Sequence, residues 1–146
     1  VREVGRFPVR ISAMSTPKII VYSDDASVRQ TIISSLGTKL GSDLPAHEVK
    51  EFATGPALRL YIDNGGKADL FILDGEAAPE GGMGISRQLK DEEFNCPPVL
   101  LLIARAEDNW LASWSRAEDV ALHPIDPFTL AKKAAALLSA RLLSNR

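Results

Sequence analysis

The sequence predicts an α/β fold with a parallel β-sheet covered by helices on both faces. Short apolar runs alternate with segments of helical periodicity along the 146-residue chain. Most of the runs are almost continuously apolar, as is typical of strands that are buried on both faces. Helix caps and turns rich in glycine or proline separate the segments, so each is predicted to be a discrete element.

The five strands are predicted from composition. Residues 18–22 and 70–73 are short runs rich in branched aliphatic and aromatic side chains, and residues 99–103 are wholly apolar and follow a double proline. Residues 47–52 alternate weakly, and residues 120–122 form a shorter fifth run. This order of strands and intervening helices favours a doubly wound sheet with right-handed crossovers.

The five helices are predicted from apolar side chains at helical spacing, supported by start and stop signals. Glycine follows the first helix, Thr54 is placed to cap the second, and Asp126-Pro127 places a cap residue before a proline at the start of the last. In chain order, the first three predicted helices carry the apolar residues from Val28 to Leu36, from Leu58 to Ile62, and Ile85 with Leu89, and the last two span residues 107–117 and 126–142.

Composition excludes several classes of protein. A formal net charge of −2 argues against nucleic acid as the main partner, because DNA binding needs an excess of Lys and Arg. No apolar run approaches the roughly 18–20 residues that span a bilayer, and the first residues lack the apolar core of a signal peptide. The single cysteine, Cys96, cannot form an intrachain disulfide. We therefore expect a cytoplasmic protein.

Residues 1–17 are predicted to be an N-terminal extension to a single domain over residues 18–146. The extension carries Arg2, Arg6 and Arg10 and precedes the first predicted strand. Two interpretations stay open: either the residues before Met14 precede the natural start of the protein, or the extension contacts a partner.

Polar side chains follow three of the predicted strands. Ser23-Asp24-Asp25 follows the first strand, Asp74 ends the third, and His123 follows the fifth. In a doubly wound sheet these ends meet at one edge, where ligands bind. Carboxylates there suit a hard cation such as Mg²⁺, with Asp24, Asp74 and Glu76 as candidate ligands. Helix caps and turns use the same residue type, so a structural role is the alternative.

In this order and spacing, the motifs resemble the receiver domain of bacterial two-component response regulators over about residues 18–140. The resemblance also covers Gly82 and its helix, the fourth strand, and His123-Pro124, which stands where the family has Lys-Pro. It implies a flavodoxin-like sheet of five strands in the order 2-1-3-4-5 with five helices. It further implies that Asp74 is the phospho-acceptor and that Asp24 binds Mg²⁺.

Four positions of the phosphorylation switch depart from the family pattern, and the proline after the phospho-acceptor comes one place late, at Pro79. Ser23 replaces an acidic residue, Ile103 a hydroxyl residue, Val120 an aromatic residue and His123 a lysine. In the family, the lysine and the hydroxyl group hold the phosphoryl group, and a charge-assisted hydrogen bond contributes about 1.5–3 kcal/mol. Histidine, with an ordinary pKa near 6.5, is only partly protonated at neutral pH. We therefore predict that the phosphorylation switch is degenerate.

Two tryptophans point to a protein partner. Trp110 and Trp114 lie four residues apart on the fourth predicted helix and therefore share a face. Against the family pattern, Trp110 is expected to point inward and Trp114 to face solvent, where tryptophan is a strong interface anchor. The face formed by helix four, strand five and helix five is the usual docking surface of receivers. Packing of both rings on the core is the alternative.

We therefore predict a stand-alone pseudo-receiver that binds a protein, as an accessory or regulatory subunit of a larger assembly, without catalysis and with no cofactor beyond weakly bound Mg²⁺. Because the chain ends at Arg146, just past the last helix, no DNA-binding domain is expected. The alternative is a working response regulator that uses Asp24, Asp74 and protonated His123. A phosphatase or a flavin carrier on the same fold is a third hypothesis. Asp74-Gly75-Glu76 resembles the motif of an aspartate-nucleophile phosphatase, but there the motif follows the first strand, and the acidic Ser23-Asp24-Asp25 loop disfavours a flavin because it repels phosphate.

Overall fold

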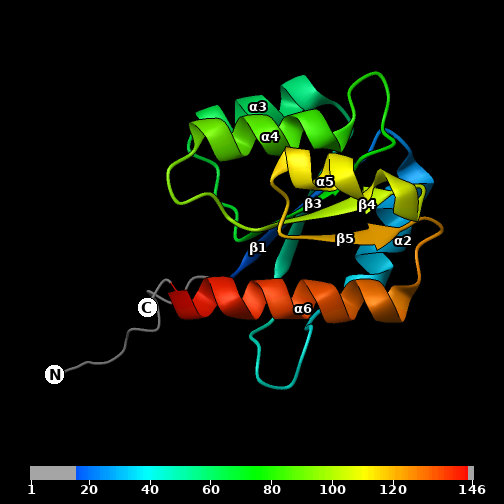
Figure 1. Cartoon of the computed structure of the whole chain (residues 1–146). Coiled ribbons are helices and arrows are strands. Elements are labelled where there is room, and N and C mark those ends of the chain that lie inside the picture. The colour runs from blue at the N-terminus through cyan, green and yellow to red at the C-terminus, as the bar shows by residue number, and fades with distance from the viewer. Residues whose placement is uncertain (1–15, 145–146) are drawn as a thin grey trace, which may run out of the picture.

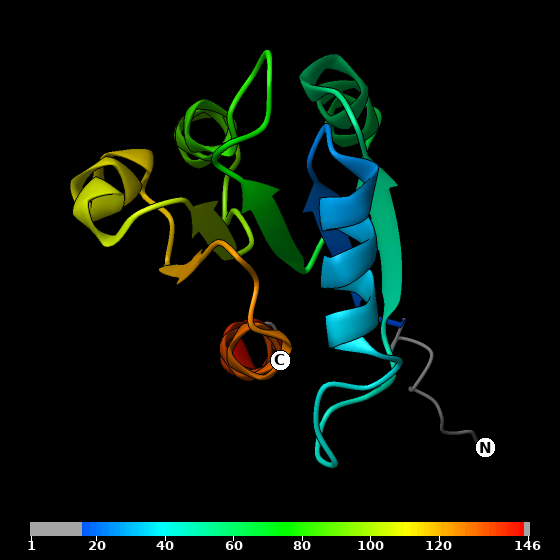
Figure 2. The ribbon, with the colours of Figure 1, turned by 90° about the vertical axis from the view of Figure 1, so that its right-hand side faces the viewer.

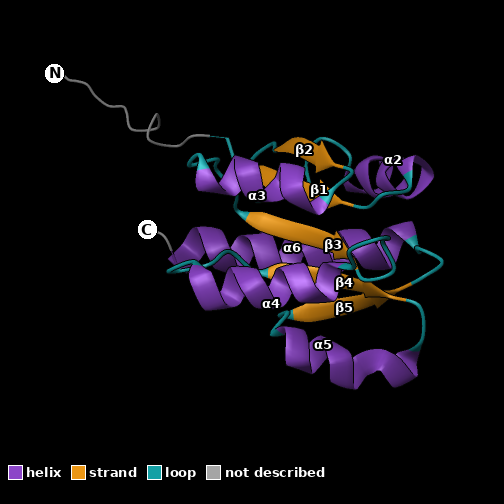
Figure 3. Ribbon diagram, turned by 90° about the horizontal axis from the view of Figure 1, so that it is seen from above, coloured by secondary structure: helices purple, strands orange, loops and turns teal. Residues whose placement is uncertain are grey.

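The computed structural model of the chain describes residues 16–144. Its centre is a five-stranded parallel sheet in the order β2-β1-β3-β4-β5, as predicted (Figure 1). The strands lie side by side in Figure 3, with β2 and β5 at the two edges of the sheet. Their bounds are β1 Lys18–Tyr22, β2 Glu48–Phe52, β3 Leu70–Asp74, β4 Val99–Ile103 and β5 Asp119–Leu122.

Helices cover both faces of the sheet. On one face lie α2 and α6, the latter seen end-on in Figure 2, and on the other lie α3, α4 and α5 (Figures 1 and 2). Their bounds are α2 Ala26–Leu36, α3 Gly55–Asp63, α4 Gly82–Glu92, α5 Asn109–Ser115 and α6 Pro127–Ser144, with a 3₁₀ turn, η1, at Ala106–Asp108.

The fourth predicted helix, residues 107–117, is shorter than expected. Its first residues form the 3₁₀ turn, and α5 proper ends at Ser115 because Arg116 has a left-handed φ of 65°. The helix caps agree with the sequence. The side chain of Thr54 accepts the Ala57 amide at the start of α3, and that of Asp126 accepts the Thr129 amide at the start of α6.

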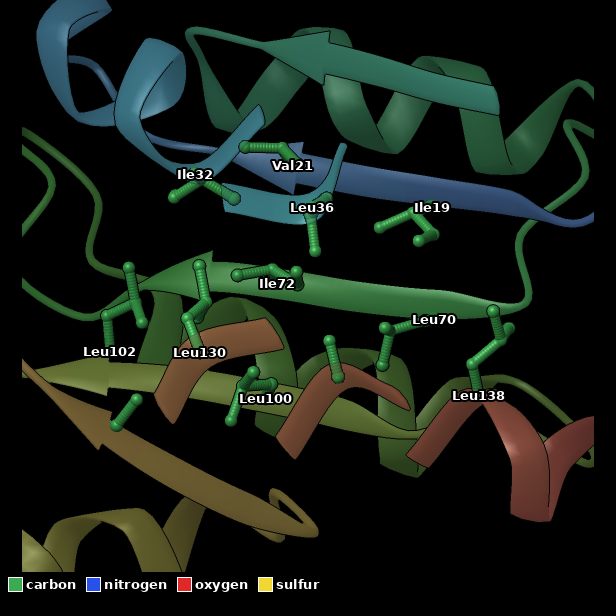
Figure 4. Packing of buried hydrophobic residues seen from close by; sticks show 12 residues of the cluster. Ile19, Val21, Ile32, Leu36, Leu70, Ile72, Leu100, Leu102, Leu130 and Leu138 are labelled. Atoms are coloured by element: carbon green, nitrogen blue, oxygen red, sulfur yellow. The ribbon is translucent and has the colours of Figure 1, made fainter. Parts of the chain in front are cut away.

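The core has two layers because successive side chains of a strand point to opposite faces of the sheet. Ile19 and Val21 of β1 pack with α2 and α6, whereas Ile20 and Tyr22 pack with α3, α4 and α5. Figure 4 shows the first layer, where Leu130 and Leu138 of α6 meet side chains of β3 and β4. Most side chains of both layers are fully buried, so the ends of the strands are anchored in the core.

Almost the whole predicted N-terminal extension lies outside the described residues, and only Thr16 and Pro17 belong to them. The division at residue 17 and the contact of residues 1–17 with a partner therefore stay predictions. Over residues 16–144, no helix is long and apolar enough to cross a membrane.

His47, just before β2, is buried, and both of its ring nitrogens lack a hydrogen-bond partner within residues 16–144. Burial lowers the pKa of its imidazole below the ordinary value of 6.5. Below that value the unfolded chain therefore binds more protons at His47 than the folded chain does. The folded state should lose stability as the pH falls below 6.5, by at most about 1.4 kcal/mol for each pH unit.

We expect His47→Leu to reduce this loss, because leucine fills the site without a titrating group. Urea unfolding of both proteins at pH 7 and pH 5 measures the difference, since the two proteins share every other ionisable side chain. Identical pH dependence of the two proteins would show that His47 does not titrate differently on folding.

Candidate functional site

Three polar side chains meet at the carboxyl edge of the sheet, as the sequence predicted. Ser23 follows β1, Asp74 ends β3 and His123 follows β5. Backbone hydrogen bonds fix two of these positions, because the Ser23 amide donates to the Phe52 carbonyl at 3.2 Å and the His123 amide donates to the Ile103 carbonyl at 2.9 Å. The side chains are thus placed by the sheet rather than by a free loop.

The carboxyl group of Asp74 lies at the centre of the site and is only 3% exposed. Its Oδ2 accepts the Ser23 hydroxyl at 2.8 Å, and its Oδ1 accepts the Glu76 backbone amide at 2.9 Å. Nε2 of His123 lies 2.9 Å from the same Oδ1. Because a carboxylate can only accept, this Nε2 carries a hydrogen. Three donors from the protein therefore converge on one buried carboxylate, and these hydrogen bonds offset the free energy lost when the carboxylate leaves water.

The two other acidic residues of the edge are engaged elsewhere. Asp25 caps α2, with its Oδ1 accepting the Ser27 amide at 2.8 Å, and hydrogen bonds from Ser27 lower the pKa of its carboxyl group. Oδ1 of Asp24 accepts the Ala78 amide at 3.0 Å, which ties the loop after β3 to the loop after β1. The structural role that the sequence left open is thus observed for Asp25.

The predicted magnesium ligands do not form a metal cluster. Within residues 16–144, no three His, Cys, Asp or Glu side chains are grouped so that they could hold a metal ion. Glu76 faces Asp74 through its backbone amide, while its own side chain is exposed. Both oxygens of Asp74 and one oxygen of Asp24 already accept hydrogen bonds from the protein. The role of Asp24, Asp74 and Glu76 as magnesium ligands therefore stays a prediction.

Comparison with known proteins identifies the family. No family model matches the chain. The chain is 51% identical over 123 residues to the uncharacterized response regulatory protein of two strains of Mycobacterium tuberculosis, a match that covers 84% of this chain and 92% of the relative. The chain belongs to the response regulators.

Solved structures agree with this identification at the level of the fold. A CheY-like receiver domain protein from Methanospirillum hungatei superposes with a TM-score of 0.72 at 17% identity, covering 89% of this chain and 99% of that one. The response regulator DrrB of Thermotoga maritima, an OmpR/PhoB homologue, gives 0.69 at 22% identity. The match to DrrB covers 86% of this chain but only 54% of DrrB, so the chain spans about half the length of that protein.

The other two departures from the receiver pattern lie on β4 and β5. Ile103 ends β4 and is 1% exposed, so its side chain offers only apolar surface where the receiver pattern has a hydroxyl group. Val120, in β5, is partly buried against the layer that contains Ile103. Neither side chain can donate or accept a hydrogen bond.

The two tryptophans are both exposed, and the expectation that Trp110 points inward is wrong. Trp110 is 68% exposed and Trp114 is 49% exposed. The residues of α5 that face the sheet are Ala112 and Ser115, which are buried, so helical spacing turns Trp110 outward. The Trp114 ring is covered on one side by the guanidinium of Arg87 at 5.4 Å, a cation–π contact that also fixes its orientation.

An ion pair that sequence reasoning missed secures the loop after β3 of this receiver domain. Arg59 of α3 forms two hydrogen bonds with the carboxylate of Glu80, one of them at 2.9 Å, and its Nε donates to Gln88 of α4. The Tyr22 hydroxyl donates to the Glu80 carbonyl at 2.6 Å. The guanidinium lowers the pKa of the Glu80 carboxyl group. No local pattern links these residues, because they lie on different elements.

We expect Arg59→Met to loosen this loop. A pair whose side chains are about a third exposed contributes about 1 kcal/mol, so hydrogen exchange at the Ala78 amide should accelerate about fivefold. Lys18→Met is the matched control, because it breaks the Lys18–Glu48 pair without touching the loop. Equal exchange in all three proteins would mean that the Arg59–Glu80 pair does not hold the loop.

Proposed function

We propose that this receiver domain acts as a docking module whose Asp74 phosphorylation switch is degenerate. The observation that carries the proposal is the hydrogen bonding of Asp74, whose two carboxylate oxygens accept three donors supplied by the protein itself. A phosphoryl group on either oxygen would displace at least one of these donors. Such a carboxylate suits a structural role better than the role of a phosphoryl acceptor.

The surroundings support the same proposal. Ile103 cannot bond to a phosphoryl oxygen, and Val120 has no aromatic ring that could move in response to one. His123 offers a single hydrogen to Asp74 where a lysine would offer three. With these side chains, phosphorylation of Asp74 would lack the contacts that couple it to a conformational change of the domain.

The proposed docking face is formed by α5, β5 and the start of α6. Trp110, Trp114, Leu122 and Phe128 are exposed there, each by 47% or more. Between α5 and α6 lies a groove of about 410 Å³ that is lined largely by apolar side chains of β5 and its neighbours. Exposed aromatic side chains beside an apolar groove are typical of interface anchors.

We further infer that the module is cytoplasmic and non-enzymatic and serves as an accessory or regulatory subunit of a larger assembly. The single cysteine fits a reducing compartment. Partner binding through the exposed tryptophans needs no catalytic group.

The switch proposal is tested by incubating the protein with Mg²⁺ and acetyl phosphate and then treating it with hydroxylamine, which cleaves acyl-phosphates. We expect no hydroxylamine-sensitive phosphoryl group on Asp74. The wild type and Asp74→Asn should therefore lose the same mass, or none, on hydroxylamine treatment. Efficient acyl-phosphate formation on Asp74 would favour the alternative, a working response regulator.

The docking proposal is tested by comparing proteins retained from cell extract by the wild type, by a Trp110→Ala/Trp114→Ala variant and by a control. Leu60→Ala is the matched control, because Leu60 is 62% exposed but lies on α3, away from the proposed face. We expect one or more proteins that the wild type and the control retain and the double variant loses. Retention of the same proteins by all three would contradict the proposed face.

A further inference from the structure

His123 and Asp74 together form a dyad with a recognisable chemistry. The ring is held from one side only, since Nε2 lies 2.9 Å from Oδ1 of the buried Asp74 carboxylate. The hydrogen therefore resides on Nε2, and in the neutral ring the lone pair resides on Nδ1. A histidine oriented in this way by a carboxylate has the arrangement of a nucleophile or a general base.

The free nitrogen of this ring is accessible. The side chain of His123 is 22% exposed, whereas that of Asp74 is 4% exposed. Within residues 16–144, the buried side-chain nitrogen and oxygen atoms that lack a partner belong to His47 and Arg141 alone. Nδ1 of His123 has no hydrogen-bond partner among the described residues either, so it must reach solvent.

The dyad is also rigidly placed. The His123 amide donates to the Ile103 carbonyl, which fixes the backbone, and the Ser23 hydroxyl holds the other oxygen of Asp74. Both carboxylate oxygens are therefore anchored when the ring acquires charge. Arg105, two residues past β4 on the same edge, is 68% exposed in its pair with Asp108, so this guanidinium is available to a phosphate oxygen.

We propose that Nδ1 of His123 is a phosphoryl-accepting site, with Asp74 as its positioning residue and a small acyl-phosphate as the donor. This activity goes beyond the docking function and does not depend on it. The lone pair of Nδ1 attacks phosphorus, the bond from phosphorus to the acyl oxygen breaks, and the carboxylate leaves with the electron pair. The hydrogen stays on Nε2, where the Asp74 carboxylate stabilises the positive ring.

The acidic side chains at the carboxyl edge of the sheet determine which charge state of the phosphoryl donor can approach. Asp24 and Glu76 are exposed near the dyad and repel a free anion. A magnesium complex of the donor carries less negative charge, so it is the form expected to approach Nδ1. The proposed acceptor therefore takes a neutralised acyl-phosphate of small size.

The test incubates the full chain with acetyl phosphate and Mg²⁺ and records the intact mass after alkali treatment, which spares a phosphohistidine and removes an acyl-phosphate. We expect a mass increase of one phosphoryl group that survives this treatment, is lost in acid and maps to the peptide of His123. His123→Gln should abolish it, and a melting curve checks that this variant folds.

The Asp74→Asn variant tests whether Asp74 only positions His123 or itself accepts the phosphoryl group. Its amide can donate to Nε2 and favour the tautomer with hydrogen on Nδ1, so labelling should slow by about tenfold or more without disappearing. A label on Asp74 that alkali removes and that persists in His123→Gln would overturn the degenerate switch, and it would overturn this proposal too if no alkali-stable label accompanies it. No label at all would overturn this proposal and leave the docking function intact.

Discussion

Gly82→Ala should destabilise the protein by about 1–3 kcal/mol, because it overpacks the contact between α4 and β3. A Cβ atom at Gly82 would lie 2.8 Å from Cβ of Leu73 and 2.9 Å from the carbonyl oxygen of Asp74. Both neighbours belong to the central strand and cannot move away as a flexible side chain would. The start of α4 would have to shift, and the loop that covers Asp74 would shift with it.

Gly84→Ala is the matched control in the same helix. Apart from its chain neighbours and the backbone of its own helix, no atom lies within 4 Å of a Cβ at Gly84, so alanine should stabilise the protein by about 0.5–1 kcal/mol through its better helix propensity. Urea unfolding of the wild type and both variants measures the two changes in unfolding free energy, which should have opposite signs. Destabilisation of similar size in both would mean that the effect comes from the helix and not from the contact with β3.

The strands and the carboxyl edge could be predicted because their signals are local. The apolar runs at β1, β3 and β4 are continuous and are interrupted by polar residues where the strands end. Parallel strands bring those ends together whatever the side chains are, so Ser23, Asp74 and His123 could be placed at one edge without coordinates.

The orientation of Trp110 could not be predicted in the same way. It depends on where α5 begins, and a 3₁₀ turn shortens that helix at its start while Arg116 ends it early. The prediction for Trp110 rested on a regular helix over residues 107–117, which is longer than α5. A shift in where the helix starts changes which residues face the sheet, and here Ala112 and Ser115 occupy the buried positions.

The contacts that define the chemistry of the site were also beyond reach of the sequence. The Asp24–Ala78 bond joins a side chain to a backbone amide 54 residues away, and the Arg59–Glu80 pair spans 21 residues between different elements. Such contacts depend on loop conformation, for which the sequence carries no periodic signal. The contact of Asp24 with the loop after β3 therefore came from the structure alone.

Ser23→Asp should destabilise the protein by about 3–5 kcal/mol in the presence of a chelator, because it places a second carboxylate beside one that is already buried. Ser23 is fully buried, and its hydroxyl is the donor to Oδ2 of Asp74. The substitution therefore removes a donor and adds a like charge at the same point. Urea unfolding in chelator measures the loss.

Mg²⁺ should restore part of this stability in Ser23→Asp and none in the wild type, since paired carboxylates are the hard oxygen ligands that the ion prefers. At a concentration about 100 times the dissociation constant, the gain is about 2.7 kcal/mol. Ser23→Ala separates the two effects: it loses the donor to Asp74, at about 1–3 kcal/mol, but should gain nothing from Mg²⁺. A wild type stabilised by Mg²⁺ as strongly as Ser23→Asp would show that Asp24 and Asp74 already bind the ion, and the hydrogen bonds described for them would then be exchanged for metal contacts.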